Sequence, residues 1–144
     1  WLPDNINKEA EGSHNGENYI AYSYYLENKG EEEISYWYSV VADDVIKNVD
    51  EAVRIMIYIN DEQVIYAKRN STTLEPEKDT VPFRDDKDGT IILQERAGMM
   101  PGSIDKITVV IWLEGDDPEC VNAILGGEMK MHMDITEEHI EEKK

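Results

Sequence analysis

The residues whose types and spacing come closest to a metal site lie between Arg84 and Glu95, in the sequence RDDKDGTIILQE. Asp86, Asp88 and Glu95 occupy the third, fifth and twelfth positions of a calcium-binding loop, and Gly89 occupies the sixth, where such loops turn sharply. The first position holds Arg84, a cation where calcium needs a carboxylate. A β-turn that opens a strand is therefore favoured, with calcium as the alternative and no other cofactor indicated.

A second candidate is the sequence MKMHMD, because thioethers and an imidazole are soft ligands that suit Cu(I). In a strand, successive side chains point to opposite faces, so Met129, Met131 and Met133 share one face and His132 lies on the other. The four side chains then cannot readily form one coordination sphere. We expect the methionines to pack in the core, against the apolar positions between Ile107 and Leu113.

Nucleophilic or metal-dependent catalysis has little support. Cys120, the only cysteine, falls in the first turn of a short helix expected at 117–125, where the helix dipole favours a thiolate. No orienting group or oxyanion site accompanies it, so a half-buried structural thiol is favoured. The chain has three histidines and no H-E-x-x-H motif. We therefore expect no enzymatic activity.

Aromatic residues suggest a surface for glycans or for a partner protein. Tyr19, Tyr25 and Trp37 occupy the less apolar sides of the first two expected strands, and would form an exposed strip if those strands paired. The favoured interpretation is that both faces of these strands are covered, as in a sandwich, with the exposed strip as the alternative. The acidic runs at 31–33, 43–44 and 116–117 are expected to be solvated turn residues, with convergence of two runs on a cation as the alternative.

The elements that would position these residues are mostly strands. Alternating apolar positions predict strands at 19–27, 34–42, 90–96, 106–115 and 128–136, and a hairpin with strands at 54–59 and 63–68. Residues 45–53 are ambiguous between helix and loop, with a loop favoured, and 69–88 read as a long connection. Short strands without alternating helices predict an all-β antiparallel two-sheet sandwich, either jelly-roll or immunoglobulin-like.

The expected organisation is a polar N-terminal arm at 1–18, one β-sandwich domain at 19–136 and a charged tail at 137–144. The 144 residues include 32 acidic and 14 basic residues, which gives a formal charge of −18. Such a charge repels phosphate backbones and argues against nucleic acid as a partner. No apolar run is long enough to span a membrane. The start at Trp1 suggests a processed or truncated chain, from which any export signal or anchor would be missing.

Three segments resemble exported sandwich proteins of the TasA and camelysin family of Gram-positive bacteria: YIAYSYYLENKGEE, PGSIDKITVVIWLEG and DDPECVNAILGGEMKMHMDI. They cover about half of the chain, and the last is most similar to uncharacterised exported members. The resemblance implies a jelly-roll sandwich, secretion, and a place at the cell surface or in a biofilm matrix, where some relatives form fibres. Camelysin-type peptidase activity is not carried over, because the histidine motif is missing. A donor segment for fibres is not evident before Asn18.

The sequence thus predicts a non-enzymatic, extracellular or cell-surface protein that acts as a matrix, adhesive or scaffold component through its sheet edges or aromatic face. Its partners would be extracellular proteins or polysaccharides, or further copies of the same chain. A calcium-dependent or carbohydrate-binding module is the first alternative. A camelysin-like metallopeptidase is the second.

Overall fold

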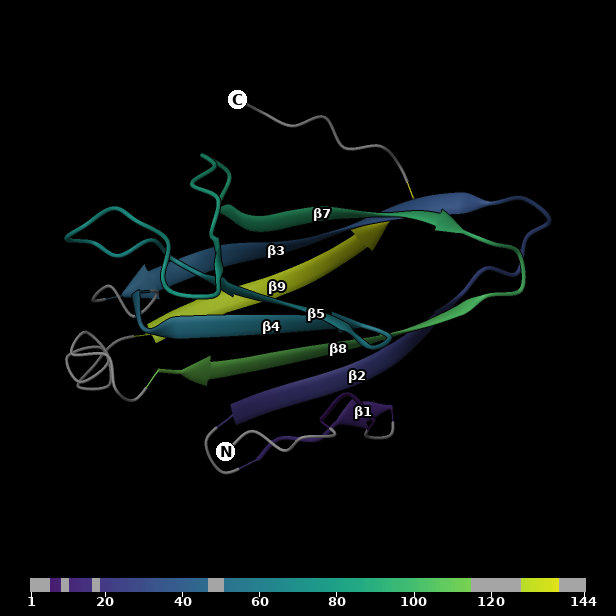
Figure 1. Ribbon diagram of the computed structural model, residues 1–144, viewed down its shortest axis with the longest axis horizontal. Helices are drawn as coiled ribbons and strands as arrows, with labels where there is room; N and C mark the ends of the chain where they lie inside the picture. Colours follow the sequence, from purple (N-terminus) through teal and green to yellow (C-terminus); the bar gives the residue numbers. More distant parts are fainter. Residues whose placement is uncertain (1–5, 9–10, 17–18, 47–50, 115–127, 138–144) are drawn as a thin grey trace.

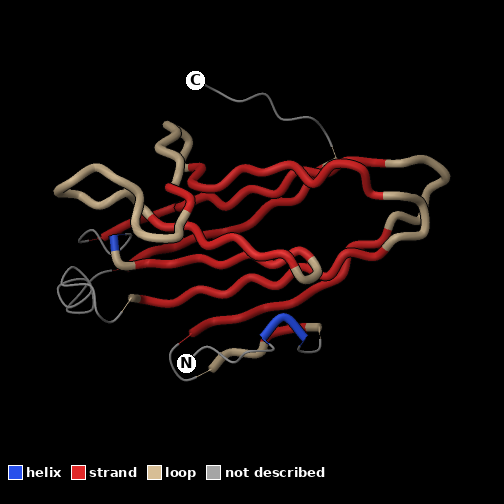
Figure 2. Tube along the Cα trace, in the orientation of Figure 1, coloured by secondary structure: helices blue, strands red, loops and turns tan. Residues whose placement is uncertain are grey.

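The structure is a computed structural model that describes residues 6–8, 11–16, 19–46, 51–114 and 128–137. Its long strands run side by side along the length of the molecule and form two layers (Figure 1). In the described ranges, nearly all regular structure is strand, and helix is confined to single short turns (Figure 2). The prediction of an all-β two-sheet sandwich is confirmed.

The larger sheet has six described strands in the order β1-β2-β8-β4-β5-β6. Its strands are β1 (Gly12–Ser13), β2 (Tyr19–Glu27), β8 (Ile104–Leu113), β4 (Val53–Ile59), β5 (Glu62–Ala67) and β6 (Val81–Pro82). All neighbours are antiparallel except β5 and β6. β4 and β5 form the hairpin that the sequence predicts.

The smaller sheet has three described strands in the antiparallel order β7-β3-β9. These are β7 (Thr90–Met99), β3 (Ile34–Ile46) and β9 (Glu128–Thr136). β3 continues past the predicted end at Ala42, and β7 past Arg96. Each of these strands contains a register shift that keeps it paired beyond the point where its alternation ends.

The topology selects between the two sandwich types that the sequence leaves open. Every connection between long strands, except the β4–β5 hairpin, passes from one sheet to the other. In an immunoglobulin fold the first two strands share a sheet, whereas here β2 and β3 lie in different sheets. Repeated crossing between two sheets is the arrangement of a jelly roll.

The main core lies between the two sheets. Alternate residues of β4 and β8 point inward, and Ile55, Ile57 and Ile107 are fully buried there against Tyr36, Tyr38 and Val40 of β3. The inward residues of β9, which include Met131 and Met133, pack against the same cluster. The expectation that the apolar faces of β8 and β9 share one interior is therefore confirmed.

A second core covers the outer face of the larger sheet. Ile6, in a 3-10 turn η1 (Ile6–Lys8), is 1% exposed and packs with Ala21, Met56, Val110 and Trp112. β1 pairs with β2 at the edge of the same sheet. The described part of the N-terminal arm is thus an edge segment that buries one face of the sheet.

A buried polar cluster joins the two sheets near one end. Asp105 of β8 is 2% exposed, and its carboxylate accepts hydrogen bonds from Tyr36 Oη at 2.9 Å, Arg96 Nε at 3.0 Å and Asn60 Nδ2 at 3.1 Å. Tyr36 and Arg96 belong to the smaller sheet, and Asn60 to the β4–β5 turn. Because every partner is a donor, the buried charge is well compensated.

Candidate binding cleft

The smaller sheet leaves part of the inner face of the larger sheet uncovered. Ile20, Tyr22 and Tyr24 of β2 share the parity that faces the smaller sheet, yet Ile20 is 58% exposed and Tyr22 is 49% exposed. β9 is the strand of the smaller sheet nearest to β2, as the contact of Tyr24 with Met133 shows. Among the described residues, no strand pairs with the second edge of β9. Within the part of the chain that the structure describes, the sandwich is therefore open along the β9–β2 side.

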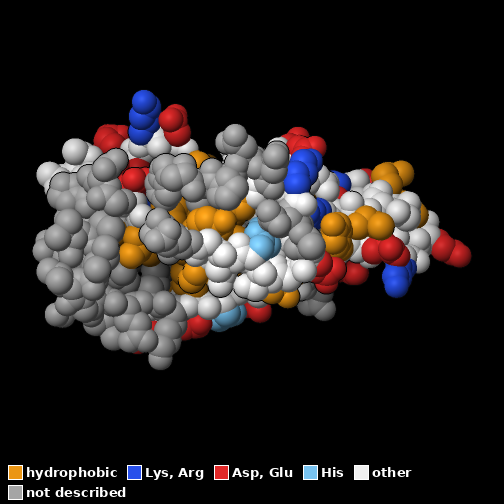
Figure 3. All heavy atoms as spheres, turned by 90° about the horizontal axis from the view of Figure 1, so that it is seen from below, with side chains coloured by type: hydrophobic (Ala, Val, Ile, Leu, Met, Phe, Trp, Pro, Cys, Tyr) orange, Lys and Arg blue, Asp and Glu red, His pale blue; other side chains and the backbone are white. Residues whose placement is uncertain are grey.

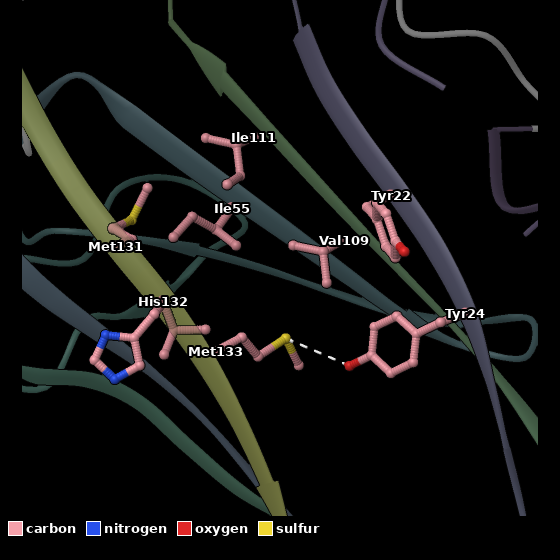
Figure 4. A pocket seen from close by; sticks show the side chains of 9 residues that line it. Tyr22, Tyr24, Ile55, Val109, Ile111, Met131, His132 and Met133 are labelled. Carbon is pink, nitrogen blue, oxygen red and sulfur yellow. Dashed lines mark hydrogen bonds between the residues drawn. The ribbon is translucent and has the colours of Figure 1, made fainter. Parts of the chain in front are cut away.

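A cleft of about 260 Å³ lies on this side. It is lined by Tyr22, Tyr24, Val40, Ile55, Val109, Ile111, Met131, His132 and Met133. Hydrophobic side chains are visible in the middle of this side of the molecule (Figure 3). In close-up, Met131 and Met133 of β9 lie across from Tyr22 and Tyr24 of β2, with the aliphatic side chains of β4 and β8 between them (Figure 4).

Tyr24 provides a polar group inside the cleft. Its hydroxyl donates to Met133 Sδ at 3.5 Å, and a thioether is a weak acceptor. Burial, together with the nearby Tyr38, raises the pKa of Tyr24 well above its usual range. The Tyr22 and Tyr24 rings stand 6.1 Å apart in a tilted arrangement. The cleft thus offers a largely apolar surface whose lining includes the hydroxyl-bearing rings of Tyr22 and Tyr24.

The outward face of β9, called the rim, carries charged side chains, in contrast to the apolar cleft. His132 points away from the cleft interior (Figure 4), and its Nδ1 lies 2.7 Å from Asp43 Oδ2 of β3. Its Nε2 lies 3.2 Å from Asp134 Oδ2 of β9 itself. The hydrogen bond with Asp43 and the charges of both carboxylates raise the pKa of His132. The surface beside the edge of β9 therefore carries two carboxylates and one histidine.

The residues proposed for calcium do not come together. Asp86 is held by Arg84 Nε at 2.9 Å, and Asp88 accepts from the Thr90 amide at 3.0 Å. Glu95 is exposed in the middle of β7, five residues and about 17 Å of strand beyond Thr90. Among the described residues, no group of three or more histidine, cysteine or acidic side chains could hold a metal ion.

The turn interpretation of the same segment fits the backbone. The Gly89 amide donates to Asp86 O at 3.0 Å, and Gly89 has a φ of +87°. A Cβ atom on Gly89 would lie 2.7 Å from Ala42 O, so the glycine also allows close approach to β3.

The side chains proposed as copper ligands in the MKMHMD run do not come together either. In the MKMHMD run, Met131 and Met133 face the core and His132 is exposed on the opposite face, as expected for core methionines. The side chain of Met129, together with Cys120 and the helix expected at 117–125, lies outside the described residues.

The aromatic strip is not formed, because β2 and β3 do not pair. Tyr19 packs in the second core on the outer face of the larger sheet, and Tyr25 is exposed on that face beside Lys106, whose ammonium lies 5.8 Å from the ring centroid. Trp37 lies in the other sheet, paired with Glu95 and Thr136. The prediction that Tyr19, Tyr25 and Trp37 share a surface is wrong.

Sequence reasoning missed a serine and a histidine that meet on the outer face. His14 Nε2 lies 2.8 Å from Ser23 Oγ, which is also 2.8 Å from Thr108 Oγ1. The pair has the composition of a nucleophile and its base, but Ser23 is 0% exposed and cannot reach a substrate in this arrangement. His14 belongs to a polar arm without apolar periodicity, so no pattern in the sequence indicates this contact.

No described helix is long and apolar enough to cross a membrane. No protein-family model matches the chain, and neither a curated protein nor a solved structure is significantly similar to it.

Proposed function

We propose that this protein is a non-enzymatic, extracellular or cell-surface scaffold component that binds extended protein segments through the open β9–β2 side of its sandwich. The observation that carries the proposal is the exposure of Ile20 and Tyr22 on a sheet face that is otherwise core. An added strand beside β9 would lie about 4.8 Å from it and would cover these side chains. One ligand would thus fill the apolar cleft and pair with the edge of β9 that no described strand occupies.

The resemblance to TasA and camelysin-like proteins supports the extracellular part of this proposal, since those proteins are exported sandwiches. The all-β architecture and the jelly-roll crossing pattern are compatible with it. Locating the protein in cell-surface and culture-medium fractions tests the compartment. Finding it only in the cytosolic fraction would contradict the extracellular assignment.

The binding role is tested with a neutral peptide of alternating valine and threonine, labelled for fluorescence anisotropy. Tyr22→Lys places a charge in the cleft and should weaken peptide binding at least tenfold. Tyr25→Lys is the matched control, because Tyr25 lies on the same strand, is 48% exposed and faces the opposite side. Equal binding by wild type and both variants, or no binding by wild type, would contradict the proposal.

The absence of enzymatic activity is tested with casein. The purified chain should leave casein intact over many hours, with and without added Zn²⁺ or Ca²⁺. Turnover that persists through purification and is lost on adding a chelator would instead support the camelysin-like alternative.

A further inference from the structure

Resting on the proposed function, we infer that the segment bound at the open side comes from a different protein and alternates apolar with basic residues. The apolar half of this pattern follows from the cleft. Of the cleft residues, Tyr22, Tyr24, Met131 and Met133 come from the two strands that flank the opening. A strand beside β9 sends every second side chain into this space, and a charged side chain there would lose its hydration.

The basic half follows from the rim. Outward side chains of an added strand would neighbour the outward side chains of β9, which include His132 and Asp134, with Asp43 close behind on β3. Opposite charges in neighbouring strands stabilise pairing, and like charges directly opposite destabilise it. When His132 is neutral, the side chains described on this rim carry the charge of two carboxylates, those of Asp43 and Asp134. Lysine or arginine at outward positions fits this rim, and glutamate or aspartate does not.

The net charge extends the argument to the whole partner. At −18, a second copy of this chain meets a strong repulsive field before any contact forms. A basic segment is attracted by the same field, which also raises its rate of association. The charge balance therefore favours a cationic hetero-partner over self-assembly.

The length of the uncovered inner face of β2 limits the segment. Tyr22 and Tyr24 line the cleft and Ile20 is exposed beside them, so these three successive inward positions span five residues. A matching strand presents three apolar side chains inward, so a segment of about five to seven residues fills the opening.

The test uses three synthetic nine-residue peptides that alternate valine with lysine, threonine or glutamate, titrated into the full chain. We expect the valine–lysine peptide to bind at least tenfold more tightly than the valine–threonine peptide, and the valine–glutamate peptide more weakly than either. Raising NaCl from 50 to 500 mM should remove most of the difference. In NMR spectra, the amide signals of β9 should shift, and Tyr22→Lys should abolish these shifts while Tyr25→Lys preserves them.

The outcomes separate this inference from the function on which it rests. If the valine–threonine peptide binds at the cleft as tightly as the valine–lysine peptide, the inferred basic pattern is wrong and the binding role stands. If no peptide binds, both fail. If a block peptide with the same five valines and four lysines in a non-alternating order binds equally well, attraction is purely electrostatic and the strand pattern is wrong. Concentration-dependent self-association of the chain, measured by sedimentation at 150 mM NaCl, would overturn the hetero-partner in favour of a second copy.

Discussion

At the scale of single residues, two charged clusters have opposite environments and opposite consequences. Asp105 is buried and joins the two sheets through Tyr36 and Arg96. His132 is exposed and links β9 to β3 through Asp43. Neither cluster is visible as a motif, because each joins residues that are far apart in sequence.

We predict that Asp105→Asn destabilises the fold by about 3 kcal/mol, since it leaves the Arg96 guanidinium without its buried carboxylate. Burial raises the pKa of Asp105, but hydrogen bonds from Arg96, Asn60 and Tyr36 more than offset this, so the pKa lies below its ordinary value. The stabilisation that ionised Asp105 supplies is therefore present above the unfolded pKa of about 3.8 and is lost as pH falls through the folded pKa.

Urea unfolding at pH 7 and pH 3 measures the free energy of unfolding of wild type and Asp105→Asn, with a variant at an exposed position, Asp85→Asn, as the control. A midpoint equal to that of the control at pH 7 would contradict the role of the cluster.

His132 gives a pH dependence of the opposite sign. Its folded pKa is raised above the ordinary 6.5, so the stabilisation that it supplies is fully present below pH 6.5 and is lost as pH rises through the folded pKa. The difference in Tm between wild type and His132→Asn should therefore shrink from pH 5.5 to pH 8.5. Asp43→Asn should reduce this pH dependence, because it removes the closer carboxylate. A difference that grows with pH would show that the histidine is not stabilised as a cation.

At the scale of elements, the alternation of apolar and polar residues predicted the strands that have one face in the core and the other face toward solvent. β2 and β9 have the predicted limits, and the hairpin of β4 and β5 lies where its turn residues place it. β3 runs past Ala42 because Asp43 stands on an exposed face, where a charge is tolerated and pairs with His132. β7 runs past Arg96 because Gly98, at a φ of +74°, and a nearby register shift continue the pairing.

The candidate site could not be predicted in the same way. The cleft exists because β9 lies over the β2 side of the larger sheet, and this depends on strand order, which spacing along the chain does not encode. The aromatic strip failed for the same reason, since it required β2 to pair with β3. The contribution of Ile6 was missed because a single buried side chain in a polar arm produces no period.

The arm offers a test at this scale. Ile6→Ala should destabilise the whole domain by at least about 2 kcal/mol, because Ile6 is almost fully buried against Met56, Val110 and Trp112. Lys8→Ala, at an exposed position in the same 3-10 turn, is the control. Equilibrium unfolding followed by tryptophan fluorescence gives both midpoints. If Ile6→Ala unfolds like wild type, the arm is not part of the cooperative unit.

At the scale of the whole molecule, the charge of −18 opposes compaction as well as self-association. Raising the NaCl concentration from 10 to 300 mM should therefore raise Tm by screening this repulsion.

A calcium site would stabilise the fold further and specifically, because a ligand that binds only the folded state shifts the equilibrium toward that state. Because Glu95 stands apart from Asp86 and Asp88, we expect 2 mM CaCl₂ and 2 mM MgCl₂ to give the same Tm. A higher Tm in calcium alone would place the calcium-dependent module ahead of the scaffold component.

The polar contacts that join the two sheets are stronger on one side of the sandwich than on the other. Asp105 joins the sheets at the level of Asn60, about 20 Å along the strands from Ile111 at the cleft. Tyr38 and Tyr66 add a hydrogen bond on the β5 side. On the β2 side, the polar contact among the described residues is the weak one from Tyr24 to Met133. We therefore expect thermal fluctuations that separate the two sheets to be larger at β9, where a guest strand would enter, than at the opposite side of the sandwich.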